Sequence, residues 1–216
     1  MAHTLDQSQT NHDLWLTTTI YGVRWRGQSF TTGVGVTNIS KVALWLRRGG
    51  DDLTATVNVH AVDGDGKPTG ASMGSKDITG VPTGAGEVEF EFATAIDCLA
   101  ETKYCFVLSY PNGDASNALS LWSAPADSAY AGGEHQISQD GGDTWGVYTA
   151  YDSYFKTYYE EAAAEAFTES CTEATTLVDS IALKSEFSKA KTDAVGLNES
   201  VQRPTGFHIT VEDGAQ

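Results

Sequence analysis

The segment 87–92, Glu-Val-Glu-Phe-Glu-Phe, alternates strictly between charged and apolar residues. Successive side chains of a β-strand point to opposite faces of a sheet, whereas an α-helix would scatter this pattern around its circumference. The alternation therefore predicts a strand with Val88, Phe90 and Phe92 against a core and the three glutamates toward solvent. Such a strand needs partners, so the segment commits this part of the chain to a β-sheet.

A similar period of two recurs along the chain and predicts about nine strands separated by turns. The predicted strands lie within residues 14–26, 39–47, 53–62, 87–92, 103–110, 118–123, 134–138 and 151–158. Runs rich in Gly, Asp, Asn and Pro separate them, as in 63–70 and 111–117. No amphipathic run of helical length interrupts the strands. This pattern predicts an all-β fold, an antiparallel β-sandwich or jelly roll.

Residues 138–145 have the S-x-D-x-G-x-T-W spacing of an Asp box, a hairpin motif that recurs in sialidases. The motif residues are Ser138, Asp140, Gly142, Thr144 and Trp145. Asp140 can accept N–H bonds across the turn, the two glycines permit positive φ, and Trp145 can place its indole under the loop. A sialidase propeller needs several such boxes and a longer chain. One box therefore predicts a structural hairpin, with no catalytic residue and no enzyme activity.

Charge and hydropathy exclude two classes of partner. The formal net charge is −16, and the 13 Lys and Arg residues are scattered rather than clustered, which argues against binding to nucleic acid. No apolar run approaches the length of a membrane span. Residues 1–19 also lack the charged start and apolar run of a Sec signal, which predicts synthesis in the cytosol without export by that route.

Two aspartate pairs are candidates for binding calcium. Asp63 and Asp65 lie in one Gly-rich turn, and Asp140 and Asp143 lie in the Asp box. Calcium takes oxygen ligands from such loops, but the spacing lacks the downstream Glu of an EF-hand loop. Asp is also favoured in turns for its own hydrogen bonds. Turn formation is the preferred interpretation, and calcium is the one cofactor left open.

The cysteines and histidines carry no clear chemical signal. Cys98 and Cys105 flank a short turn, so the sequence allows a disulfide across the hairpin, which would leave Cys171 unpaired. The favoured interpretation is that both are free thiols packed as small apolar groups. His60 and His135 have no partner Ser, Cys or carboxylate at a telling position. We interpret both as strand histidines rather than acid–base groups.

Trp45 is the sequence's candidate for stacking on a sugar. It alternates with Leu44 and Leu46 and therefore faces away from the core, beside Arg47. Most other aromatic residues are expected to fill the space between two sheets. Trp45 and Arg47 thus form the predicted glycan site, with packing against a neighbouring subunit as the alternative use of that face.

The succession DQSQT, GQSFTTG, ISKVALWLRRGG, VDGDGKPTG, TKYCFVLSYPNGDASN, SQDGGDTW and YDSYFKTY resembles a β-sandwich module of tailed-phage virion proteins. Such modules are similar to galactose-binding-like and carbohydrate-binding jelly rolls. The resemblance covers about residues 4–158 and implies a sandwich domain over residues 1–158. Modules of this kind serve adhesion, decoration and scaffolding alike, and the resemblance implies no catalytic residues.

The composition changes after Tyr159. Residues 160–166 favour a helix, and an acidic residue followed by Ser then recurs at 169–170, 179–180 and 199–200. This degenerate repeat resembles tails that accompany such modules in phage proteins. With few large apolar residues, the segment is not expected to fold alone. We expect residues 159–216 to form a partly helical or extended arm that orders on a partner.

Two functions follow as expectations. The first is a non-enzymatic structural protein of a tailed-phage virion, such as a capsid decoration, head-fibre or tail-fibre subunit. It would be made in the host cytoplasm and exposed on the particle, with other virion proteins and copies of itself as partners. The alternative is a carbohydrate-binding module for glycans of the host surface. The missing Sec signal favours the virion protein, since a secreted lectin needs one; an adhesion fibre would combine both.

Overall fold

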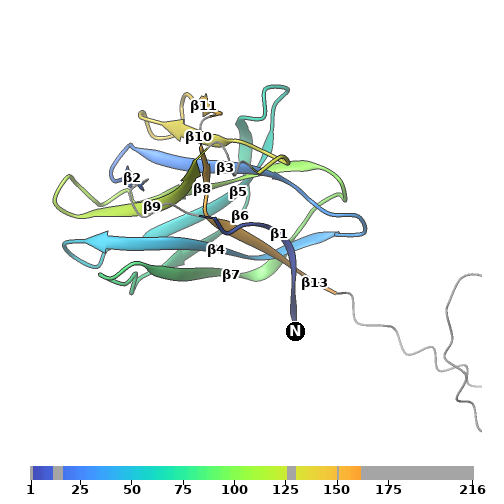
Figure 1. Cartoon of the computed structure of the whole chain (residues 1–216), viewed down its shortest axis with the longest axis horizontal. Coiled ribbons are helices and arrows are strands. Elements are labelled where there is room, and N and C mark those ends of the chain that lie inside the picture. Colours follow the sequence, from blue (N-terminus) through green and yellow to red (C-terminus); the bar gives the residue numbers. More distant parts are fainter. Residues whose placement is uncertain (1, 12–16, 126–129, 150, 162–216) are drawn as a thin grey trace, which may run out of the picture. The chain divides into compact units, whose positions relative to one another are not determined.

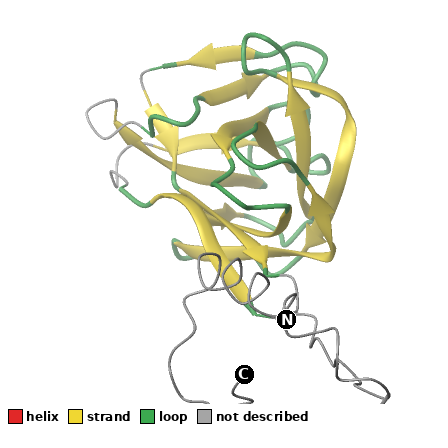
Figure 2. Cartoon of the chain, turned by 90° about the vertical axis from the view of Figure 1, so that its right-hand side faces the viewer, coloured by secondary structure: helices red, strands yellow, loops and turns green. Residues whose placement is uncertain are grey.

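The computed structural model describes residues 2–11, 17–125, 130–149 and 151–161. They belong to one compact unit, Met1–Ala163. The described residues form strands, turns and loops and contain no helix (Figure 2). Accordingly, no helix in this part of the chain is long and apolar enough to cross a membrane. The predicted all-β class is confirmed.

The strands are more numerous than the sequence predicted. In chain order they are β1 (His3–Gln9), β2 (Thr17–Ile20), β3 (Trp25–Thr31), β4 (Asn38–Gly49), β5 (Ala55–Val62), β6 (Pro68–Ile78), β7 (Gly86–Asp97), β8 (Lys103–Ser109), β9 (Ala118–Pro125), β10 (His135–Ser138), β11 (Gly146–Tyr148), β12 (Tyr151–Ser153) and β13 (Phe155–Glu160). Several of the additional strands are short or lie at a sheet edge, where a period of two is hard to read from sequence.

The strands form two antiparallel sheets that pack on each other as a sandwich (Figure 1). The seven-stranded sheet has the order β1-β13-β4-β9-β12, with β2 also on β9 and β7 also on β4. The six-stranded sheet has the order β11-β10-β3-β8-β5-β6. The predicted β-sandwich is therefore confirmed.

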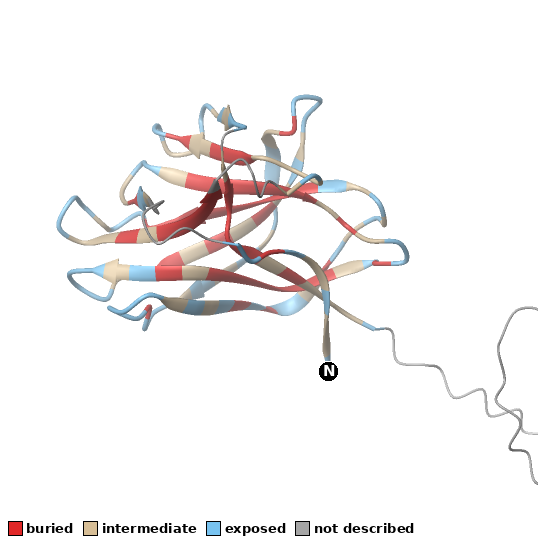
Figure 3. Cartoon of the chain, viewed as in Figure 1, coloured by how far each residue is buried: buried red, intermediate tan, exposed pale blue. Residues whose placement is uncertain are grey.

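The core lies between the sheets, where the buried residues concentrate on the central strands (Figure 3). Phe30 of β3 packs against Phe106 of β8 and Phe155 of β13, with ring centroids 6.5 and 6.2 Å apart. On β7, Phe90 and Phe92 are buried while the glutamates are exposed, as the alternation predicted. Burying each such aromatic side chain stabilises the fold by roughly 1.5–3 kcal/mol.

Strand β6 corrects the sequence prediction, which assigned all of residues 63–70 to a turn. The turn gives way to β6 at Pro68, and β6 pairs with β5 along an irregular register. It is an edge strand in which residues 69–73 are all exposed. Because neither face of this stretch is buried, its sequence needs no apolar alternation, and the usual signal of a strand is missing.

The two ends of the domain lie side by side, since β1 pairs antiparallel with β13 and His3 is opposite Glu160. Figure 1 shows the N-terminus near the end of β13. The last strand runs two residues past the predicted domain boundary at 158. Residues 162–216, which hold most of the predicted arm, its acidic-Ser repeat and Cys171, lie outside the described residues.

Candidate functional site

A recess of about 340 Å³ lies on the outer face of the six-stranded sheet. Its lining residues are Trp25, His60, Pro68, Thr69, Gly70, Val107, Gly141, Gly142, Asp143 and Trp145. His60 and Val107 come from β5 and β8, where they alternate with the core residues Val59 and Phe106 and therefore face outward. Val107 is only 1% exposed despite facing outward, so loops cover this part of the sheet.

Two segments provide the walls of the recess. The loop of the Asp box, between β10 and β11, supplies residues 141–143 and Trp145 on one side, and the start of β6 supplies residues 68–70 on the other. The Gln136 side chain of β10 donates a hydrogen bond to the carbonyl oxygen of Gly66, 3.2 Å away. The bond ties the hairpin to the β5–β6 turn and holds the two walls in place.

The Asp-box loop is held by its own side chains. Asp140 accepts the backbone N–H of Thr144 at 3.0 Å and also the Thr144 hydroxyl. Ser138 donates to Asp140 at 2.7 Å and accepts the N–H of Gly142 at 2.9 Å. The two bonds from Thr144, followed by the bond from Ser138, lower the pKa of Asp140 to about 2. Gly141 and Gly142 have φ of 77° and 96°, a region that favours glycine.

The indole that packs against this loop is that of Trp25, whereas the sequence predicted Trp145 in this place. A Cβ on Gly142 would lie 2.8 Å from the Trp25 ring, so the loop rests directly on it. Trp25 Nε1 donates to the carbonyl of Gly22 at 2.9 Å, which fixes the ring. Trp145, predicted to lie under the loop, is half-buried and lines the recess. Residues 25, 27 and 29 share the outer face of β3, and this period of two is the sequence pattern that could have placed Trp25 on the outer side of the sheet.

The recess combines an uncharged ring with a free carboxylate. Burial lowers the pKa of His60, against a smaller opposite effect of its hydrogen bond with the Gly70 backbone, so the ring is neutral near pH 7. Its Nδ1 is buried and has no hydrogen-bond partner among the described residues. Asp143 is exposed, and no described residue donates a hydrogen bond to its carboxylate or pairs with it. The exposed Asp143 carboxylate can accept hydrogen bonds from a ligand.

His135 lies elsewhere, buried completely between the sheets. Its Nδ1 lies 2.9 Å from the Ser153 hydroxyl. Burial, and to a smaller extent the charge of Arg26, lower the pKa of His135 to about 3. The ring is therefore neutral, and a substrate from solvent cannot reach it in this conformation.

The aspartates proposed for calcium are engaged in turn bonds, apart from Asp143. Asp63 accepts the N–H groups of Asp65 and Lys67, each at 2.9 Å, and Asp65 pairs with the Lys67 ammonium at 3.3 Å. Among the residues that the structure describes, no three His, Cys, Asp or Glu side chains gather as metal ligands. Calcium binding stays a prediction.

Trp45 and Arg47 lie on the outer face of the other sheet, away from the recess. Trp45 is half-buried rather than exposed and packs on Tyr154, with ring centroids 5.4 Å apart; the glycan site at Trp45 and Arg47 stays a prediction. Arg47 is exposed, and its guanidinium lies 5.7 Å from the centre of the Trp122 ring. The sequence could not show that the strand pairing with β4 would bring Tyr154 over Trp45.

Cys98 and Cys105 are free thiols, so the disulfide that the sequence left open is not formed. Cys105 is fully buried on β8, and Cys98 is half-buried. Burial is the main reason why the pKa of Cys98 rises to about 11 and that of Cys105 also rises. Neither thiol is ionised near neutral pH.

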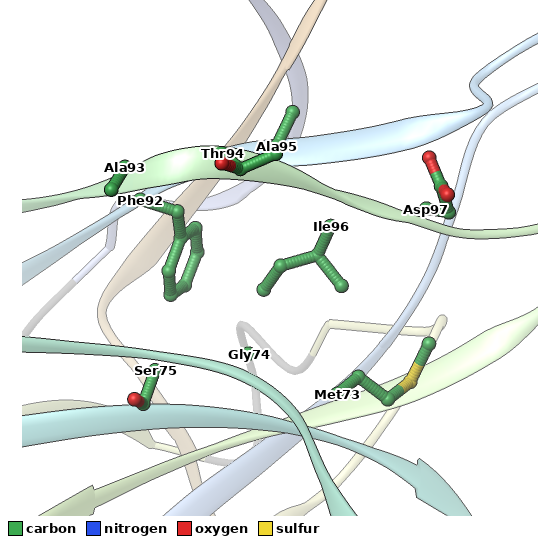
Figure 4. A pocket seen from close by; sticks show the side chains of 9 residues that line it. All are labelled: Met73, Gly74, Ser75, Phe92, Ala93, Thr94, Ala95, Ile96 and Asp97. Carbon is green, nitrogen blue, oxygen red and sulfur yellow. The ribbon is translucent and has the colours of Figure 1, made fainter.

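A second hollow, of about 400 Å³, opens between the edge strands β6 and β7. Phe92 and Ile96 point from β7 toward Gly74 and Ser75 of β6 (Figure 4). Its side chains are mostly small or apolar, with Asp97 as the one charged residue in the lining. Ligand pockets usually carry several convergent polar groups that orient the ligand, so the recess at the Asp box is the better candidate.

Comparison with known proteins adds no assignment to this geometry. The chain matches no protein-family model and none of the curated proteins.

Proposed function

We propose that this chain is a non-enzymatic binding protein that holds a carbohydrate in the recess at the Asp box. The observation that carries the proposal is the pairing of two indoles, Trp25 and Trp145, with the exposed carboxylate of Asp143 in one hollow. Flat aromatic rings offer an apolar surface to the C–H face of a sugar, and a few placed polar groups can bind its hydroxyls.

Each polar group has a role in this proposal. The exposed Asp143 carboxylate accepts hydrogen bonds from sugar hydroxyls. The hydrogen bonds of Asp140 and Ser138 hold the loop before the ligand arrives. A wall that is already ordered loses little conformational entropy on binding, which favours affinity.

The test is a glycan array probed with the full chain, followed by titration of the best glycan. Trp145→Ala removes an indole from the recess and is expected to weaken binding by at least about tenfold, the equivalent of about 1.4 kcal/mol. Trp45→Ala removes an indole from the other sheet and is expected to leave affinity unchanged. Circular dichroism checks that both variants fold. An array without any bound glycan overturns the proposal. Loss of binding in Trp45→Ala alone would place the glycan site at Trp45 on the other sheet.

A second proposed function, compatible with the first, is that of a structural subunit of a tailed-phage virion. The adjacent domain ends favour it, because His3 of the first strand lies opposite Glu160 of the last strand. A domain whose ends lie together can project from an anchor formed by the arm. The resemblance of residues 4–158 to phage modules supports the same role, with other virion proteins and copies of itself as partners.

Deletion of residues 162–216 tests this second function. The truncated chain is expected to keep its β-sheet circular dichroism spectrum and to be missing from assembled particles. Normal incorporation of the truncated chain would refute the anchoring role of the arm.

A further inference from the structure

The chemistry of the recess also restricts which sugar it can hold. Resting on the proposed carbohydrate function, we propose that the recess prefers a sugar with a free ammonium group and rejects acidic sugars. Asp143 is the only Asp, Glu, Lys or Arg among the lining residues, and His60 is neutral near pH 7. A charged ligand in this hollow therefore meets a single negative charge.

Asp143 differs from its neighbours because its carboxylate is uncommitted. The oxygens of Asp140 accept bonds from Thr144 and Ser138, and Asp65 pairs with Lys67. By contrast, no described residue donates to the Asp143 carboxylate or pairs with it. An ammonium group of a ligand would form a charge-assisted hydrogen bond there, and these are stronger than bonds between neutral groups.

The basic residues near the recess do not belong to its lining. Lys67 lies on the β5–β6 turn, and Lys103, the first residue of β8, has its Cδ 3.8 Å from a Cβ built on Gly66. Arg26 faces the inside of the sheet, where it donates to the carbonyl of Trp25 at 2.7 Å. The net charge of −16 adds repulsion of anions at longer range.

The indoles favour the same class of ligand. A cation over the face of a tryptophan is attracted by the ring, and the attraction grows when the site is partly shielded from water. Trp25 and Trp145 line the same hollow as Asp143. An amino sugar would place its C–H face and its ammonium group among these three side chains, whereas a uronic or sialic acid would bring a carboxylate beside Asp143.

Matched oligosaccharides test the preference by isothermal titration of the full chain. The set is a glucosamine trimer, an N-acetylglucosamine trimer and a galacturonic acid trimer, with free choline as a cation that has no sugar ring. The glucosamine trimer is expected to bind about fivefold more tightly than the acetylated one at low salt, as one exposed charge contact implies. High salt should reduce this difference, and the acidic trimer should not bind.

Asp143→Asn distinguishes a specific contact from the general acidity of the protein. The variant should bind the two neutral or cationic trimers equally, while Asp97→Asn, the same change at an exposed site on β7, should keep the native preference. Neutral sugars binding as tightly as amino sugars, or acidic ones binding at all, would overturn the inference but leave the carbohydrate function. Binding of choline alone, or of nothing, would overturn both.

Discussion

Gln136 donates a hydrogen bond from the Asp-box hairpin to Gly66 of the β5–β6 turn, at 3.2 Å, and thereby joins the two walls of the recess. The Gln136 side chain is completely buried. Gly66 itself has a φ of 77° and is buried. Two loops that are distant in sequence therefore form the recess, and the side-chain amide of Gln136 connects them.

We expect Gln136→Ala to destabilise the protein and weaken ligand binding together. The substitution leaves the Gly66 carbonyl without its donor, and an unsatisfied buried polar group costs about 1–3 kcal/mol. Urea unfolding measures the free energy of unfolding. Gln139→Ala, at an exposed position of the same loop, serves as the control and should change stability little. Equal stability of both variants would show that the link does not hold the walls.

The Asp-box bonds predict local loosening in Asp140→Ala. Asp140 holds the Thr144 N–H, so the variant should increase hydrogen exchange at the Thr144 amide, measured by NMR, while the core strands stay protected. The native loop should also respond to acid. Because the folded pKa is lowered to about 2 from 3.8, the stabilisation is complete above about pH 4 and is lost as the pH falls through about 2. Unchanged exchange in the variant would contradict this.

The local alternation of apolar and polar residues was sufficient to predict the all-β class of the fold. The alternation at 87–92 correctly placed Phe90 and Phe92 in the core, because one face of β7 is buried and the other is exposed, which imposes a period of two. The edge strand β6 escaped prediction, since residues 69–73 are exposed and carry no such period. Pairing between distant strands, such as β1 with β13, has no local signature at all.

The candidate site was less predictable than the fold, for the same reason. The sequence pointed to Asp143 and Trp145 for other roles. Asp143 was predicted to be a turn residue or a calcium ligand, and Trp145 was predicted to place its indole under the loop. Trp25 and His60 join them only through the sheet order β10-β3-β8-β5. In contrast, Trp45 had the right alternation for exposure, yet Tyr154 of the neighbouring segment covers it.

His135 predicts a dependence of stability on pH. Its folded pKa is about 3, against about 6.5 in an unfolded chain. Between these values the unfolded state binds more protons, so stability falls as the pH decreases, by at most about 1.4 kcal/mol per pH unit. Burial raises the pKa of Asp152, which acts in the opposite direction and reduces the net slope. His135→Gln should therefore lose less stability than the native protein between pH 6.5 and pH 4 in urea unfolding.

That comparison removes only the histidine, because Asp152 is present in both proteins and its contribution cancels. His3→Gln, which removes a histidine at a half-buried site on β1, is the matched control. It should keep the native pH slope. Equal slopes for His135→Gln and the native protein would mean that His135 is accessible to protons in the folded state.

Gly74 of β6 leaves no room for a larger side chain where β6 lies against β7. A Cβ on Gly74 would lie 2.6 Å from both Cγ1 and Cδ1 of Ile96, which is closer than atoms can approach. Gly74→Ala should therefore destabilise the protein by about 1–3 kcal/mol, as overpacking does. Gly64→Ala, where nothing lies within 4 Å of the added Cβ, is the control in the same unfolding experiment. Adding Ile96→Val, which removes Cδ1, should recover part of the loss in Gly74→Ala. If the double variant is no more stable than Gly74→Ala, the clash with Ile96 is not the cause.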